Sequence, residues 1–208
     1  EIPIGKDALK ALNLDSCVYE LDIHKHRNND CYYHIGFAYE IASILNRKVT
    51  LPDMSYKTVD DDVNNYISLE IDTPKCPYYT GRMATNLTIK ESPKFIKKRL
   101  IDAGMRPINN VIDISNYVML EFGQPLHFFD KDTLGTKIVV RDAYENEKLV
   151  TLDNNERVLK ASDIVITDGK KSICLAGVMG GLNTEVTENT KNIFIEAAIF
   201  DNISIRNT

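Results

Sequence analysis

The stretch from Arg106 to Asp130 constrains the fold of this chain more than any other part of the sequence. A polar helix start is followed by an apolar segment that ends at Gly123, and then by Gln124-Pro125-Leu126-His127-Phe128-Phe129-Asp130. Glycine commonly follows the last turn of a helix, and proline stiffens the chain around it. The pattern therefore predicts a helix, a stiff turn and a strand, with His127 at the end of the turn.

Composition favours a folded chain without a broad basic surface. The 208 residues are 43% hydrophobic, which is sufficient for the core of one or two domains. The net charge of −5 leaves a nucleic acid only local contacts, because binding along its backbone requires many positive charges. The sequence contains no signal peptide and no apolar run of the ~20 residues that a membrane span needs.

The four cysteines include no CxxC pair, which favours reduced thiols that pack in a cytoplasmic protein. The chain starts at Glu1 rather than at a methionine and stops at Thr208, directly after a strand-like run. We therefore expect an excised fragment.

The hydrophobic pattern predicts a small α/β lobe followed by a larger one. Apolar and polar residues alternate over 17–23, as in a strand, and apolar residues follow helical spacing over 37–45. The pattern then dissolves into polar residues that include Pro52 and three consecutive aspartates. We expect a small lobe over residues 1–50, a linker over 51–65 and a second lobe over 66–208.

The second lobe has the pattern of an α+β fold. Alternation over 83–89 predicts a strand, and Ser92 and Pro93 predict the N-cap and first turn of a helix that ends at Gly104. A second helix ends at Gly123, and short apolar runs follow it at 138–140, 149–152, 158–159, 164–166, 173–175 and 193–200. Residues 153–156 and 168–171 resemble hairpin turns.

Glu196 is the first candidate site residue. It lies in an apolar run, Ile193 to Phe200, that is typical of a strand covered on both faces. An unpaired buried carboxylate costs several kcal/mol, roughly, so Glu196 requires a partner. Arg82 or Arg141 could be an internal partner, and a ligand hydroxyl could be a functional one; the residues alone leave both open.

His127 and a glycine cluster are the next candidates. A lone histidine is more often structural than functional, but His127 follows Pro125 in the kind of connection that often carries function. Gly177, Gly180 and Gly181 would let the backbone approach a ligand closely or form a tight turn. They lack the spacing of a dinucleotide or phosphate-binding motif.

A zinc site in the first lobe is an alternative. Four residues capable of binding zinc fall within eleven positions: His24, His26, Cys31 and His34. Their spacing matches no common zinc pattern, and solvated loop residues are the simpler interpretation. We therefore predict no metal site.

Several motifs, in this order along the chain, resemble the beta subunit of bacterial phenylalanyl-tRNA synthetase. They are Cys76-Pro77-Tyr78-Tyr79-Thr80-Gly81-Arg82, the stretch from Arg106 to Asp130 with Ser115-Asn116-Tyr117, the run Gly177 to Gly181, and Glu196. By this resemblance, residues 66–208 correspond to the family's tRNA-editing domain. Residues 1–45 resemble the small domain beside it.

The resemblance implies proofreading. In this family the whole enzyme is a heterotetramer with an alpha subunit, and it joins phenylalanine to tRNA(Phe) with ATP and magnesium. The editing domain hydrolyses tyrosine wrongly attached to that tRNA. We therefore expect the tRNA 3′ end as the partner of this chain, and no cofactor for the fragment, which lacks the residues for amino-acid activation.

The resemblance also implies the site. His127, in the Gly-Gln-Pro-Leu-His motif, would help to place the tRNA terminus or the water, and Glu196 would read the tyrosine hydroxyl. Gly180 would line the amino-acid pocket with Gly177 beside it. The full set expected to bind substrate is Glu196, Gly180, Gly177, Ser115, Asn116 and Pro125.

Two departures from the family pattern leave a second function open. The family's Thr-Pro-Asn-Arg run reads His24-Lys25-His26-Arg27 here, so only Arg27 is retained, although Asp30 keeps its position. The chain also ends before the family's Thr-x-Ala segment, which forms another wall of the pocket. The alternative is a non-catalytic module for subunit assembly and tRNA docking, with an inactive pocket.

Overall fold

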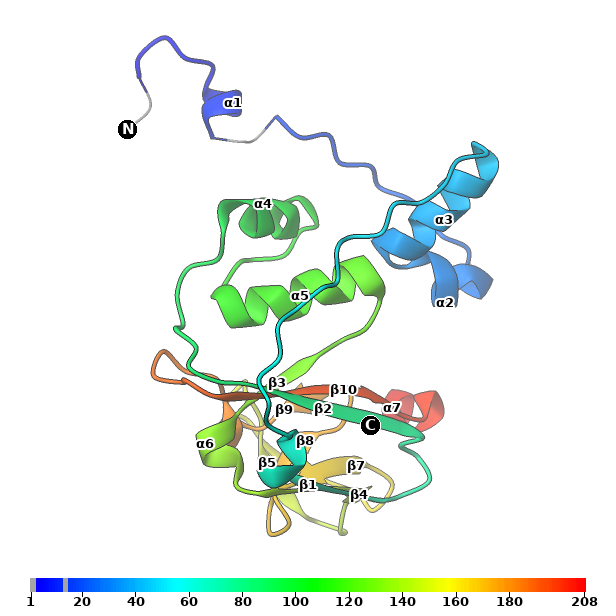
Figure 1. The fold of residues 1–208 in the computed structure, drawn as a ribbon. Helices are drawn as coiled ribbons and strands as arrows, with labels where there is room; N and C mark the ends of the chain where they lie inside the picture. The colour runs from blue at the N-terminus through cyan, green and yellow to red at the C-terminus, as the bar shows by residue number, and fades with distance from the viewer. Residues whose placement is uncertain (1–2, 13–14) are drawn as a thin grey trace. The chain divides into compact units, whose positions relative to one another are not determined.

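The computed structural model describes residues 3–12 and 15–208, and these form two compact units (Figure 1). Unit 1 contains the described residues of 1–53 together with 90–125, and unit 2 contains 54–89 together with 126–208. The units divide inside the predicted linker, but the segment 90–125, expected in the second lobe, belongs to unit 1. The assignment of residues 66–208 to one editing domain stays a prediction.

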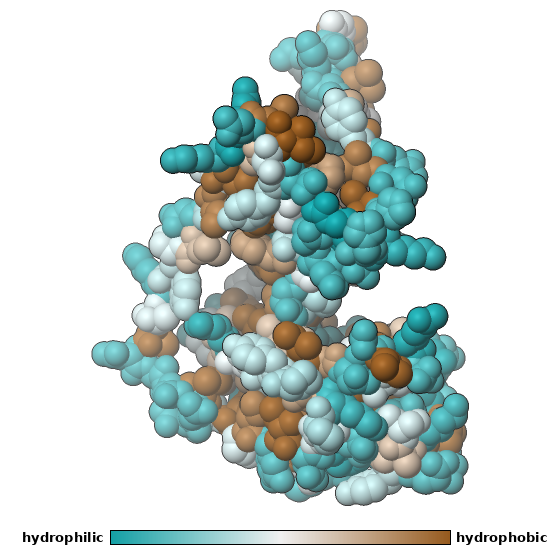
Figure 2. All heavy atoms as spheres, turned by 90° about the vertical axis from the view of Figure 1, so that its right-hand side faces the viewer, coloured by the Kyte–Doolittle hydropathy of each residue, from teal (hydrophilic) through white to brown (hydrophobic). Residues whose placement is uncertain are grey.

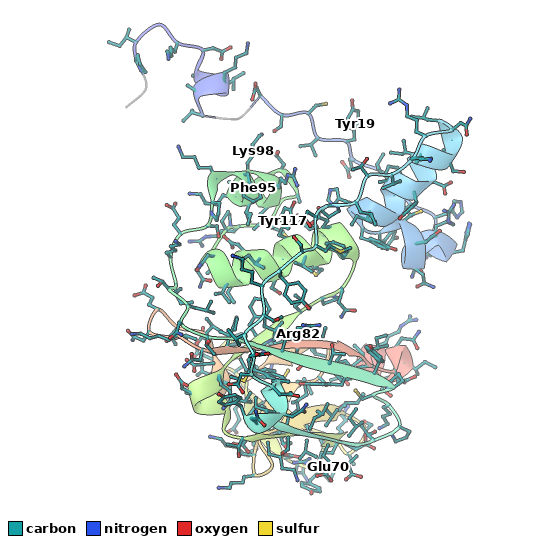
Figure 3. All side chains as sticks on the ribbon, viewed as in Figure 1. Tyr19, Glu70, Arg82, Phe95, Lys98 and Tyr117 are labelled. Atoms are coloured by element: carbon teal, nitrogen blue, oxygen red, sulfur yellow. The ribbon has the colours of Figure 1, made fainter. Side chains whose placement is uncertain are left out.

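Unit 1 is built from helices in its described residues. They are α1 (Ala8–Ala11), the 3₁₀ turn η1 (Lys25–Arg27), α2 (Asn28–Cys31), α3 (His34–Ile44), α4 (Lys94–Asp102) and α5 (Asn110–Phe122). Helix α5 packs against both α3 and α4, and the edge of the Phe95 ring contacts the Tyr117 ring at a centroid distance of 6.3 Å (Figure 3). The helix predicted over 37–45 and the two that end at glycines are confirmed.

Local sequence explains both ends of α5. The Asn109 side chain accepts hydrogen bonds from the backbone N–H groups of Val111 and Ile112, which have no partner within the helix. At the other end Gly123 has φ +76°, a left-handed conformation that glycine adopts without steric cost. The chain can therefore turn directly into the segment that leads to His127.

Three sequence predictions for these regions are wrong. Residues 17–23 form no strand in the described structure, because alternation produces a strand only where a neighbouring strand supplies hydrogen bonds. The strand predicted over 83–89 lies earlier, as β2 (Tyr78–Ala84). The N-cap of α4 is Pro93 rather than Ser92, whose hydroxyl instead donates to Asp113 Oδ2 at 2.5 Å.

Unit 2 contains two main sheets and a small hairpin sheet. The five-stranded sheet has the order β1 (Ser68–Asp72), β4 (Lys137–Asp142), β7 (Ile164–Thr167), β8 (Ser172–Leu175) and β9 (Met179–Gly180). The three-stranded sheet has the order β2, β10 (Ile193–Ile199) and β3 (His127–Asp130). The remaining elements are η2 (Val63–Asn65), α6 (Lys131–Leu134), β5 (Lys148–Val150), β6 (Glu156–Val158), η3 (Leu182–Thr184) and α7 (Asn202–Asn207).

The two main sheets face each other and share one core (Figure 1). Tyr79, Phe129 and Phe194 contribute from the three-stranded sheet, and Ile138 and Ile166 are among the contributors from the five-stranded one. The predicted turns at 153–156 and 168–171 connect the antiparallel pairs β5–β6 and β7–β8. The predicted α+β class is confirmed.

On the face drawn in Figure 2, hydrophobic residues are exposed at several separate places among hydrophilic ones.

Among the described residues, no helix combines the length and the apolar character that crossing a membrane requires.

Candidate functional site

Strand β10 brings the two principal candidate residues together. It is the central strand of the three-stranded sheet, and Glu196 is paired with Gly81 of β2 on one side and with His127 of β3 on the other. Directly opposite residues of antiparallel strands project to the same face of a sheet. Glu196 and His127 therefore share the face that packs against the five-stranded sheet, although 69 positions separate them in the sequence.

Glu196 is buried, and a tyrosine is its partner. Only 5% of the residue is exposed, and burial raises the pKa of its carboxyl to about 7. The hydroxyl of Tyr79 donates to Glu196 Oε2 at 3.0 Å, which opposes that rise. The carboxyl is thus hydrogen-bonded inside the core by a neutral donor.

The arginines expected as internal partners bind elsewhere. Arg82, which is labelled in Figure 3, donates from Nη1 to the hydroxyl of Tyr56 at 2.7 Å. Arg141 forms a bidentate ion pair with Glu147, with both N–O distances 2.8 Å. No cation therefore compensates Glu196 among its described contacts. The side-chain hydrogen bond of Glu196 comes from the neutral hydroxyl of Tyr79.

His127 is a neutral imidazole near physiological pH. Burial lowers its pKa to about 4, because desolvation disfavours the charged form. The edge of its ring contacts Phe129 at a centroid distance of 4.4 Å and an interplanar angle of 80°. A histidine with so low a pKa is a weak base at pH 7, but it can still donate or accept a hydrogen bond.

Gly180 leaves room for the His127 ring. A Cβ atom at Gly180 would lie 2.4 Å from His127 Cε1, so only glycine permits this approach of β9 to β3. Gly177 lies in a different environment: its φ is +66°, and a Cβ atom there would meet Ile205 and Phe200. Of these two predicted glycines, Gly180 is the one that lies beside the His127 ring.

Three other predicted residues belong to the other unit. Ser115 and Asn116 lie on α5, and Pro125 lies in the segment that follows it, all within unit 1. His127, Glu196, Gly177 and Gly180 belong to unit 2. The substrate roles of Ser115, Asn116 and Pro125 stay predictions.

The histidines of the first lobe form local contacts. The rings of His24 and His26 lie 5.1 Å apart, and His34 Nδ1 lies 2.8 Å from the carbonyl oxygen of Leu120. Arg27 pairs with Asp30 and Glu40. Within residues 3–12 and 15–208, no three His, Cys, Asp or Glu side chains are grouped as metal ligands would be.

A groove of about 1420 Å³ lies on another part of unit 2. Residues 56–63 line one side, and Thr80, Arg82 and Ile195 contribute from the sheet. Ile195 is adjacent to Glu196 in β10, so its side chain projects to the opposite face. This groove is therefore separate from the face that carries Glu196 and His127.

Sequence reasoning missed Tyr79. It lies two residues before Gly81 in β2, on the same face and diagonal to Glu196. A shift of the predicted strand to residues 78–84 would have placed Tyr79 on the buried face, but pairing between β2 and β10 cannot be read from either strand alone.

Comparisons with known proteins agree with the motif resemblance. Residues 75–208 match the model of the B3/4 domain family. The chain is 52% identical over 206 residues to the phenylalanine–tRNA ligase beta subunit of Staphylococcus aureus (strain bovine RF122 / ET3-1), covering 98% of this chain and 26% of that protein. For the beta subunit of Staphylococcus haemolyticus (strain JCSC1435), the identity is 50% over 210 residues, with 100% and 26% covered.

The chain is also similar to a solved structure. It is an N-terminal fragment of the phenylalanyl-tRNA synthetase beta subunit from Pyrococcus horikoshii, with a TM-score of 0.49 and 16% identity. The match covers 88% of this chain and 56% of that one. The chain spans about a quarter of the length of the curated relatives it matches.

Proposed function

Because the chain belongs to the B3/4 domain family, we propose that it is the editing segment of a phenylalanine–tRNA ligase beta subunit and hydrolyses tyrosine wrongly attached to tRNA(Phe). Relatives named as such beta subunits, similar over almost the whole chain, support the proposal. The partners would be the tRNA 3′ end and an alpha subunit, in the cytoplasm. ATP and magnesium would serve amino-acid activation elsewhere in the whole enzyme.

The proposed reaction is ester hydrolysis. Water adds to the carbonyl carbon of the tyrosyl ester, the bond from that carbon to the ribose oxygen of the tRNA 3′ terminus breaks, and the products are tyrosine and tRNA with a free hydroxyl. His127 would orient the tRNA terminus or the attacking water by hydrogen bonding. Its lowered pKa favours this role over that of an indispensable general base, because a group with pKa about 4 accepts a proton weakly at neutral pH.

Glu196 would supply the selectivity, and its burial is the observation that carries the proposal. Tyrosine differs from phenylalanine by one hydroxyl, which can donate to a buried carboxyl. Phenylalanine would lie against the same buried group without offering a donor. A site built to bond a hydroxyl can favour its substrate over the analogue without that hydroxyl by a ratio of ~10⁴ to 10⁵ in kcat/KM, as when a synthetase selects tyrosine against phenylalanine.

A deacylation assay tests the proposal. The intact enzyme that contains this chain is assayed on tyrosyl-tRNA(Phe) and phenylalanyl-tRNA(Phe), as wild type and with Glu196→Ala or His127→Ala. We expect Glu196→Ala to reduce the preference for the tyrosyl ester by about 10- to 100-fold, the value of one hydrogen bond to a charged group. His127→Ala should slow cleavage of both esters.

Glu185→Ala is a matched control, because Glu185 belongs to the same unit as Glu196 and is exposed. It should leave rates and preference unchanged. An equal loss for both esters in Glu196→Ala would contradict the role of Glu196. A wild-type enzyme that cleaves neither ester would favour the alternative, a non-catalytic assembly and tRNA-docking module.

A further inference from the structure

We propose that Tyr79 is a specificity-determining positioning residue: its phenol holds the carboxyl of Glu196 ready to accept a second phenol, that of the tyrosine to be removed. The inference rests on the proposed editing function. Its structural basis is the buried hydrogen bond from the Tyr79 hydroxyl to Glu196 Oε2, at 3.0 Å.

One phenol does not saturate a carboxylate. The group has two oxygens with about four acceptor positions, and Tyr79 occupies a position on Oε2. The carboxylate therefore keeps acceptor positions that a second hydroxyl could use while the first stays bound. The hydrogen bond of Tyr79 also restricts the rotation of the carboxyl, so less orientational freedom is lost when a ligand binds.

Displacement of Tyr79 by the ligand would be costly. Only 8% of Tyr79 is exposed, and its ring belongs to the core cluster that contains Phe129 and Phe194. Removal of the ring from this position would open the core between the two sheets. The packing therefore favours a Tyr79 phenol that stays hydrogen-bonded to Glu196 when the substrate tyrosine binds, rather than one that the substrate displaces.

Burial has the largest effect on the pKa of Glu196, and the hydrogen bond from Tyr79 opposes it. Besides Tyr79, the titratable groups near Glu196 in the described part of the chain are the thiols of Cys76 and Cys174 and the imidazole of His127 opposite it. Burial raises the pKa of both thiols and lowers that of His127, so all three are neutral at pH 7. The Tyr79 phenol itself has a raised pKa because of burial and the nearby carboxyl, and it stays protonated as a donor.

The test compares Tyr79→Phe with Tyr78→Phe. Both substitutions remove one phenolic hydroxyl from β2, but Tyr78 is 58% exposed and on the other face of the strand. In the intact enzyme, Tyr79→Phe should reduce the ratio of tyrosyl to phenylalanyl ester cleavage at pH 7 by about 10-fold. Cleavage of the phenylalanyl ester and the behaviour of Tyr78→Phe should be unchanged.

A pH series separates positioning from a general structural effect. The selectivity of the wild type should rise with pH through a midpoint near 7, where Glu196 ionises. In Tyr79→Phe that midpoint should move about one unit higher, because burial is no longer opposed by the hydrogen bond. A destabilised but otherwise normal site would lose rate without moving the midpoint.

Infrared difference spectra give a readout that does not depend on editing. The carbonyl band of protonated Glu196, identified by subtraction of Glu196→Gln, should titrate at higher pH in Tyr79→Phe than in the wild type. An unchanged band and an unchanged selectivity would overturn the inference, as would faster tyrosyl cleavage in Tyr79→Phe, which would make Tyr79 a competitor. If the band shifts but the wild type cleaves no ester, the proposed function fails, and the specificity role of Tyr79 fails with it.

Discussion

Glu196 and His127 face each other across adjacent antiparallel strands, and burial keeps both of them uncharged over the same pH range. The carboxyl, with a pKa of about 7, is mostly protonated below that pH, and the imidazole, with a pKa of about 4, is neutral above it. Two titratable groups can thus occupy one core face without an ion pair. Charge appears on Glu196 as the pH rises through 7.

The first prediction concerns stability and pH. The pKa of Glu196 is raised from 4.5 to about 7 in the folded state, so the folded protein holds its proton more tightly. Its contribution is fully present below pH 4.5 and is lost as pH rises through 7, by about 3 kcal/mol of unfolding free energy. Urea unfolding at a series of pH values should show this loss in the wild type and not in Glu196→Gln.

Glu185→Gln is the control for that experiment, because Glu185 is exposed. It should retain the pH dependence of the wild type. A Glu196→Gln protein with the same loss between pH 4.5 and about 7 would show that another group carries it.

The second prediction is that Gly180→Ala displaces His127. The added methyl group would lie 2.4 Å from His127 Cε1, so the ring or strand β9 must move. Overpacking of this kind costs about 1–3 kcal/mol in stability, and we expect at least ~10-fold slower ester cleavage. Gly81→Ala is the control for overpacking in the same sheet region. Its methyl group would lie 2.1 Å from the Phe194 ring instead of against His127. A His127 ring with unchanged NMR chemical shifts in Gly180→Ala would contradict the prediction.

The third prediction uses two helix-terminal glycines as a matched pair. Gly104 and Gly123 have φ of +77° and +76°, so alanine at either position incurs the left-handed backbone cost of about 1–2 kcal/mol. A Cβ atom at Gly104 would meet nothing within 4 Å, whereas at Gly123 it would lie 2.7 Å from the Tyr33 ring. Thermal unfolding should therefore show a larger loss for Gly123→Ala than for Gly104→Ala. Equal losses would mean that the Tyr33 ring moves aside freely.

The fourth prediction concerns the pair of Arg141 and Glu147. The arginine and the hydroxyl of Ser172 lower the pKa of Glu147 from 4.5 to about 2. Its contribution is present above pH 4.5 and is lost as pH falls through 2. Glu147→Gln should lower the unfolding free energy at pH 7 by about 1–3 kcal/mol and approach the wild type near pH 2.

Glu156→Gln provides the control for this pair. Glu156 pairs with Lys148 at 2.8 Å, but both side chains are more than half exposed. An exposed pair contributes ~0–1 kcal/mol, so the effect should be small at every pH. Similar losses for both variants in calorimetry would show that burial does not strengthen the Arg141 pair.

Local sequence determined much of the fold. Gly123 ends α5 because glycine adopts a left-handed conformation that other residues resist. The residues of the turns 153–156 and 168–171 likewise predicted the hairpins β5–β6 and β7–β8. The apolar run around Glu196 forms β10, and the buried acid was identified from its neighbours alone. Each of these features depends on residues close in sequence, so the chain itself was sufficient to predict them.

Only the tertiary structure determined which residues lie next to Glu196. Tyr79 and Glu196 lie 117 positions apart, and only the register of β2 against β10 brings the phenol to the carboxyl. The same non-local pairing set His127 opposite Glu196, and the lack of a pairing strand left residues 17–23 outside any sheet. A strand's alternation specifies which face is apolar, but hydrogen bonding with distant strands selects the neighbour, so the partner of the buried acid could not be found from sequence alone.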